Sequence, residues 1–210
     1  MAGEPARSPD GGHEERIPFV GLTGGIASGK SEALRILEDL GAATLSSDLV
    51  VHELIGTDDV RAALVERYGP EIAPDGEVDR SKVGERAFGD PSERSWIERL
   101  LWPKVGERIA AWYAELGRRS RRPSAAIVEV PLLFEAGMEG VFDRTVAVVA
   151  EEEVRAERAG ARGHAALEER TSRQLTQEEK AARATHVVRN DVGIEELREQ
   201  LASLLDRMIA

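Results

Sequence analysis

A glycine-rich motif of eight residues constrains this chain more than any other feature. Residues 24–31 read GGIASGKS and fit the pattern G-x-x-x-x-G-K-[ST] completely. A short apolar run at 17–23 precedes the motif and predicts a buried strand, and helically spaced apolar residues follow from Lys30. Glycines let backbone N–H groups turn inward around an anion, and a helix N-terminus favours negative charge. The motif therefore predicts a phosphate-binding loop of the P-loop type rather than a glycine-rich turn without a ligand.

The polar side chains at the end of this loop indicate a nucleotide with a metal ion. Lys30 can reach the β- and γ-phosphates of ATP, and the hydroxyl of Ser31 can ligate the Mg²⁺ that bridges them. Glu32 follows directly, and we favour an interpretation in which its carboxylate points outward from the helix. The nucleotide contacts expected in and beside the motif are Gly24, Gly25, Ala27, Ser28, Gly29, Lys30, Ser31 and Glu32.

Short apolar runs alternate with helical patterns along the rest of the chain. After the run at 17–23, further runs lie at 42–45, 125–130, 145–149 and 186–188. Short apolar strands that alternate with helices indicate a parallel sheet covered on both faces. We therefore expect an α/β, three-layer P-loop fold with a five-stranded parallel sheet.

The same patterns divide the chain into regions. A flexible tail is expected at 1–16, which is rich in glycine, proline, serine and charge, and one kinase domain at 17–210. Within that domain, a mainly helical region at about 49–120 is interpreted as an acceptor-binding insertion, and the charged helical segment at about 151–184 as a lid. Pro103 lies inside the first of these regions and is expected to kink or split its helix.

Composition excludes several classes of protein. The formal net charge is −11, which argues against a general nucleic-acid binder because such proteins are usually basic. The chain has no cysteine, so disulfides and thiolate metal sites are excluded and a reducing cytoplasm is compatible. No apolar run approaches the ~20 residues that cross a bilayer, and the N-terminus has no secretory signal. We expect a cytoplasmic protein, monomeric or weakly homo-oligomeric, with no nucleic acid or membrane partner.

Two carboxylates follow predicted strands at the edge where open α/β sheets bind ligands. Asp48 comes just after the second strand and can take a proton from a substrate hydroxyl, or it caps the next helix. Glu129 ends the third strand and can hold Mg²⁺ through water, or it is a structural hydrogen-bond acceptor; the same alternative applies to Glu135.

Residues 190–193 read NDVG and lack the lysine of the base-reading motif of GTPases. The pattern favours a small-molecule kinase.

Arginines are concentrated in the charged segment. Arg155, Arg158 and Arg162 are spaced i, i+3, i+7 and share one helical face. Arginines on a movable lid can clamp a phosphoryl group in transfer and exclude water. The alternative is a solvated helix with many Glu–Arg pairs, each of little energetic value. We take Arg158 and Arg162 as the catalytic candidates.

From about Ile17 to the C-terminus, the sequence resembles the dephospho-CoA kinase family. The phosphate loop is shared by many families, but its Thr-Gly-Gly-Ile form together with the Pro-Leu-Leu-Phe-Glu segment is much more specific. The segments that carry the resemblance are 22–31 (LTGGIASGKS), Asp48 with 51–54 (VHEL), Asp79-Arg80, Phe88, 101–103 (LWP), 130–135 (VPLLFE), 170–174 (RTSRQ), 178–180 (EEK) and 190–193 (NDVG).

The resemblance implies ATP-dependent phosphorylation of the ribose 3′-hydroxyl of dephospho-CoA, with MgATP and dephospho-CoA as the small-molecule substrates. It implies that Asp48 is the catalytic base, that Arg158 and Arg162 lie near lid arginines, and that Asn190 lies near the adenine pocket. The alternatives are another small-molecule or nucleotide P-loop kinase and a catalytically weak nucleotide-binding paralogue.

The sequence departs from the family pattern at four positions. Ser46 replaces an acidic residue, Glu32 replaces a threonine, and Gly163 replaces an acidic or amide residue. Trp102 replaces a histidine, which puts in doubt a polar contact to the substrate at that position. Because Trp102 lies on a helical apolar face, we expect it to pack in the core; stacking on substrate is the alternative.

Overall fold

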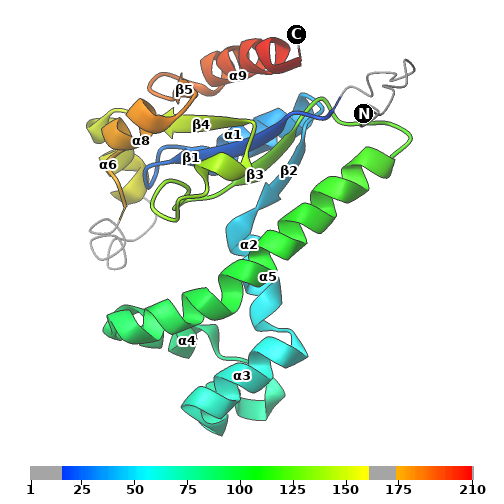
Figure 1. The fold of residues 1–210 in the computed structure, drawn as a ribbon. Helices are drawn as coiled ribbons and strands as arrows, with labels where there is room; N and C mark the ends of the chain where they lie inside the picture. The colour runs from blue at the N-terminus through cyan, green and yellow to red at the C-terminus, as the bar shows by residue number, and fades with distance from the viewer. Residues whose placement is uncertain (1–15, 161–173, 210) are drawn as a thin grey trace, which may run out of the picture.

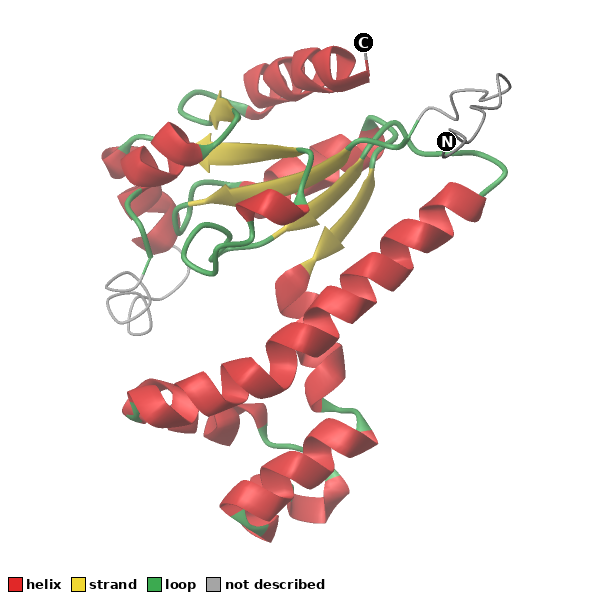
Figure 2. Ribbon diagram, in the orientation of Figure 1, coloured by secondary structure: helices red, strands yellow, loops and turns green. Residues whose placement is uncertain are grey.

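The computed structural model describes residues 16–160 and 174–209, and its centre is a parallel β-sheet (Figures 1 and 2). All four strand pairings are parallel, which confirms the five-stranded parallel sheet expected from the sequence. The strand order across the sheet is β2 (Ala43–Ser46), β3 (Ala126–Glu129), β1 (Phe19–Gly24), β4 (Arg144–Val149) and β5 (His186–Arg189).

Helices cover both faces of the sheet, as the near-continuous apolar runs of its strands require. Helices α1 (Lys30–Asp39) and α9 (Ile194–Ile209) pack together over one face, where Val20 and Leu22 of β1 are fully buried. Phe19 of β1 faces the opposite core, which is completed by other helices and by the segment that follows β3. The result is the three-layer arrangement that the sequence predicts.

The region from Ser47 to Arg118 is mainly helical and forms an arm that extends away from the sheet (Figure 1). It consists of α2 (Ser47–Ile55), α3 (Asp58–Tyr68), α4 (Arg80–Gly89) and α5 (Pro91–Arg118), with short 3₁₀ turns at 70–72 and 74–76. The arm has its own small core, which includes Val60, Leu64 and Ile97. Its acceptor-binding role depends on the site described below.

Helix α5 connects the arm to the sheet. It runs for 28 residues without interruption across Pro103, so the expected split is not found, although Figure 1 shows the helix changing direction partway along. Its buried positions Ile97, Leu101, Val105 and Ile109 are those of the predicted apolar face. The arm is therefore anchored on the core by one continuous helix.

The C-terminal half supplies the remaining elements near the phosphate loop. They are α6 (Glu152–Gly160) and α8 (Gln177–Arg183), which flank β4 and β5, and a 3₁₀ turn at 139–141. Within the described part of the chain, no helix combines the length and apolar character needed to span a membrane.

Candidate active site

The phosphate loop connects β1 to the N-terminus of α1, as the sequence predicts. Gly24 and Gly29 have φ values of 155° and 96°, which favour glycine. A Cβ atom on Gly24 would also clash with the carbonyl oxygen of Val148, and one on Gly29 with the amide of Asn190. Ala27 has a φ of 60°, an uncommon value for a residue with a side chain. This close packing sets the shape of an anion site at the start of α1.

Lys30 lies at the end of the phosphate loop, near the carboxylates of Glu129 and Asp48. Its ammonium donates to the carbonyl oxygens of Gly24 at 3.1 Å and Gly25 at 2.9 Å. Burial lowers the pKa of Lys30, and the negative charges of Glu129 and Asp48 oppose this shift. The structure thus brings together the lysine of the loop and the two carboxylates selected from the sequence.

Glu129 is nearly buried at the end of β3, beside the end of β2. Burial raises the pKa of its carboxyl group, and the charge of Lys30 counters that effect. Strand pairing places Ser46 opposite Glu129, and the Ser46 hydroxyl donates to Glu129 Oε2 at 3.1 Å. Glu129 is therefore a structural acceptor for Ser46, and it also carries a carboxylate close to the phosphate loop.

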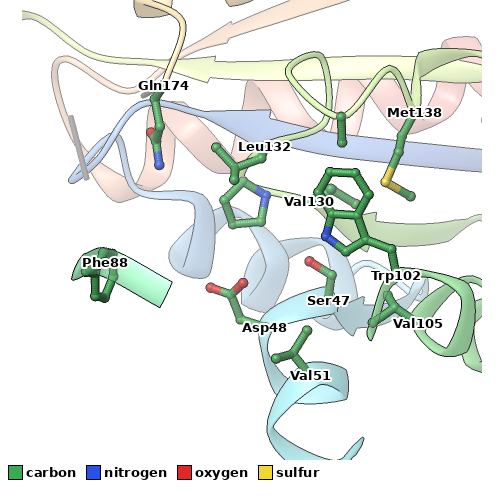
Figure 3. Close-up of a pocket in the computed structure, with 12 residues that line it drawn as sticks. Ser47, Asp48, Val51, Phe88, Trp102, Val105, Val130, Leu132, Met138 and Gln174 are labelled. Carbon is green, nitrogen blue, oxygen red and sulfur yellow. The ribbon is translucent and has the colours of Figure 1, made fainter. Parts of the chain in front are cut away.

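Asp48 does not cap α2, because the N-cap position is Ser46 and Asp48 is the second residue of the helix. Its side chain is exposed and lines a cavity of about 470 Å³ beside the phosphate loop. Figure 3 shows the carboxylate pointing into this cavity. The position and the charge of Asp48 are those of a base that can accept a proton from a substrate hydroxyl.

We call this space the acceptor cavity, and its lining is mostly apolar. Asp48 is the only charged side chain among the described residues that line it. Figure 3 shows Phe88 from α4 and Trp102 from α5 on opposite sides of Asp48. The lining residues are Ser47, Asp48, Val51, Phe88, Trp102, Val105, Val130, Pro131, Leu132, Ala136, Met138 and Gln174.

The expectation that Trp102 packs in the core is wrong. Its side chain is 48% exposed and lines the acceptor cavity, whereas its neighbour Leu101 is only 5% exposed. Consecutive helix positions point about 100° apart, so Leu101 turns to the core of the arm and Trp102 turns away from it. The aromatic ring is available to a bound molecule.

The arginines of α6 contact the phosphate-loop region. Arg155 donates from Nε to the carbonyl oxygen of Ile26 at 2.9 Å, and Arg158 donates from Nη1 to the carbonyl oxygen of Asn190 at 3.1 Å. Arg162, the second catalytic candidate, and Gly163 lie outside the described residues. Sequence reasoning ranked Arg155 below its neighbours, although its side chain makes a direct contact with the loop.

Asn190 braces the phosphate loop from the far side. It is 6% exposed, and its side-chain amide donates to the carbonyl oxygen of Ser28 at 2.9 Å. The hydroxyl of Ser28 is itself buried, with no hydrogen-bond partner among the described residues. The sequence did not indicate this bracing role of Asn190, and its expected nearness to adenine stays a prediction.

Three other acidic or hydroxyl residues have clear positions. Ser31 lies in the first turn of α1 with its side chain exposed, where a metal-bound phosphate is expected. Glu32 points outward, as favoured from the sequence, and its carboxylate pairs with Arg35 at 2.5 Å. Glu135 pairs with Lys180 at 3.1 Å behind the acceptor cavity. Lys180 is completely buried, and sequence reasoning gave it no role.

Comparison with known proteins gives one consistent match. A family model described as dephospho-CoA kinase matches residues 18–196. The dephospho-CoA kinase of Moorella thermoacetica is 38% identical over 185 residues, covering 86% of this chain and 87% of that protein. That of Synechococcus sp. (strain CC9902) is 38% identical over 194 residues, covering 89% and 94%.

Solved structures agree on the fold. A crystal structure of a Thermus thermophilus protein has a TM-score of 0.75 at 31% identity and covers 92% of this chain and 98% of its own. The dephospho-CoA kinase of Campylobacter jejuni has a TM-score of 0.66 at 22% identity, covering 90% and 96%, and supports the fold alone.

Proposed function

Because the chain belongs to the dephospho-CoA kinase family, we propose that it transfers the γ-phosphoryl group of ATP to the ribose 3′-hydroxyl of dephospho-CoA. The products are CoA and ADP, so the reaction is the last step of coenzyme A synthesis. The observation that carries the proposal is the position of Asp48, which lines the acceptor cavity and also acts electrostatically on Lys30 of the phosphate loop.

The nucleotide side binds ATP through the loop backbone and α1. Backbone N–H groups of residues 24–31 receive the phosphates, and Lys30 exchanges its bonds to the Gly24 and Gly25 carbonyls for bonds to phosphate oxygens. Arg155 and Arg158 of α6 stand beside this loop and supply positive charge toward the transferring group, with Arg162 proposed to join them.

The donor set fits Mg²⁺, which prefers hard oxygen ligands and keeps several waters. The Ser31 hydroxyl would hold the ion directly and Glu129 would hold it through water. Among the residues that the structure describes, no cluster of three or more His, Cys, Asp or Glu could cage a metal. When bound with ATP, the ion would neutralise part of the negative charge of the phosphates.

The acceptor side binds dephospho-CoA in the cavity beside Asp48. Asp48 takes the proton of the 3′-hydroxyl while the oxygen attacks the γ-phosphorus. The new O–P bond forms as the bond to the β–γ bridging oxygen breaks, and ADP leaves with the electron pair of that bond. Because the cavity walls are apolar, they exclude water from competing for the phosphoryl group.

An ADP-release assay coupled to a second enzyme tests the proposal. We expect release with dephospho-CoA and a product that carries a 3′-phosphate by mass spectrometry and ³¹P NMR. Turnover with a nucleoside monophosphate instead of dephospho-CoA would identify another small-molecule kinase. Tight ATP binding without ADP release from any acceptor would identify a nucleotide-binding paralogue.

A further inference from the structure

One segment without helix or strand structure forms much of the wall of the acceptor cavity, and we call it the cavity-wall segment. It runs from Val130 to Met138, directly after β3, and adopts turns rather than a helix or strand. Val130 N–H donates to the Leu22 carbonyl oxygen of β1 at 2.9 Å, and bonds within the segment, such as Met138 N–H to the Leu133 carbonyl, give the rest its local shape. Five of its residues line the cavity: Val130, Pro131, Leu132, Ala136 and Met138.

Lys180 of α8 holds this segment from behind. Its ammonium donates to the Pro131 carbonyl oxygen, which also accepts a bond from the Thr23 hydroxyl at 3.2 Å. The ammonium also lies 3.1 Å from Glu135 Oε1. A lysine with no exposed surface is expensive unless paired, and here both partners belong to the cavity-wall segment.

Glu135 extends the connection to a second part of the cavity. Its Oε1 accepts the backbone N–H of Leu175 at 2.8 Å, and the adjacent residue Gln174 lines the cavity. Its Oε2 is buried and has no hydrogen-bond partner in the described structure. One ion pair, outside the cavity, therefore ties together α8, the cavity-wall segment and the chain at Gln174.

We propose that Lys180 and Glu135 are positioning residues for the acceptor, an inference that rests on the proposed function. Neither side chain lines the cavity; they act by fixing the wall at Pro131 and Gln174. Among the described residues, neither side chain is hydrogen-bonded to residues 24–31 of the phosphate loop, so their loss should leave ATP binding intact.

The first test separates the two substrates. We expect Lys180→Met to raise the KM for dephospho-CoA about tenfold while the KM for ATP changes less than about twofold, because a displaced wall affects only one ligand. Lys180→Arg should recover part of the loss. The matched control is Arg183→Met, since Arg183 is exposed on the same helix and should leave both KM values unchanged.

The second test separates positioning from simple stabilisation. Replacing a buried ion pair by apolar residues often preserves stability, whereas breaking it does not. In Glu135→Met/Lys180→Met, the melting temperature should recover relative to Lys180→Met. The acceptor KM should stay high, because Pro131 has lost its bond from Lys180 and Leu175 has lost its bond to Glu135. Recovery of both quantities in the double variant would overturn the inference.

Calorimetric titration with dephospho-CoA gives a readout that does not require turnover. We expect weaker binding to Lys180→Met and to the double variant, and unchanged binding to Arg183→Met. Unchanged acceptor binding and KM in Lys180→Met would refute the positioning role while the proposed function stands. If the unaltered protein neither binds nor phosphorylates dephospho-CoA, the proposed function itself fails.

Discussion

The nucleotide side and the acceptor side of the site are built in opposite ways. The nucleotide side is centred on eight consecutive residues at the junction of β1 and α1, supported by a buried parallel sheet and contacted by Arg155 and Asn190. The acceptor cavity takes its lining from α2, α4, α5, the segment after β3 and Gln174, which are far apart in the sequence. A contiguous motif carries its geometry in its own backbone, whereas the cavity exists only when several distant elements pack correctly.

This contrast determines how substitutions should act. A change in the phosphate loop removes a charge or a backbone shape that phosphoryl transfer itself requires. A change in the cavity wall alters one surface among several and should affect acceptor binding in smaller steps. The predictions that follow test this contrast, beginning with the largest expected effect.

Lys30→Ala should produce the largest loss. The lysine is the charge that the loop offers to the transferring phosphoryl group, and removing one such contact typically costs ~3–4 kcal/mol, or ~10²–10³ in kcat. Single-turnover measurements at saturating substrates check this. Arg35→Gln, on the exposed face of the same helix, is the control and should keep wild-type turnover. A loss below tenfold would argue that the loop does not act on the transferring group.

Asp48→Asn tests the proposed base, which lines the acceptor cavity and lies near Lys30 of the phosphate loop. The amide keeps the size of the side chain but cannot accept the proton, so kcat should fall at least ~10²-fold. Because Asp48 is exposed and caps no helix, the melting temperature and the KM for ATP should change little. A correctly folded variant that retains most of its turnover would remove Asp48 as the base.

The contrast also explains what the sequence could predict. The phosphate loop, the five strands and the α1 helix follow from local patterns, because each is specified by consecutive residues. Asp48 and Glu129 were found because strand ends converge at one sheet edge. Trp102 was predicted wrongly and Lys180 was given no role, because the environments of both depend on residues that are distant in the sequence. Lys180 lies in a charged run that resembles a solvated helix, and only its meeting with Glu135 makes burial tolerable.

Trp102→Ala should have an intermediate effect confined to the acceptor side. Loss of one aromatic contact is expected to raise the KM for dephospho-CoA about tenfold and to leave kcat and the KM for ATP nearly unchanged. Trp102→Phe should retain much of the affinity. Leu49→Ala is the control, since Leu49 is 62% exposed on α2 and does not line the cavity. An equal rise in both KM values would contradict the separation of the two sides.

Glu93→Gln should have the smallest effect, on the stability of the arm alone. Bonds from Arg67 and Tyr68 lower the pKa of Glu93 to about 2, from an ordinary 4.5. A depressed pKa means that the charged carboxylate stabilises the fold above about pH 4.5, and that this contribution is lost as pH falls toward 2. The melting temperature of Glu93→Gln should therefore lie slightly below that of the wild type at pH 7, and the difference should close in acid.

Kinetics at pH 7 distinguish this arm effect from an effect on the site. Glu93 accepts a hydrogen bond from Tyr68 and does not line the acceptor cavity. The Arg67 side chain, which pairs with Glu93, lies over the Trp96 ring. If the arm acts only as a support for the cavity, Glu93→Gln keeps both KM values. If acceptor KM rises while the melting difference stays small, the packing of the whole arm, and not only the lining residues, sets the shape of the cavity.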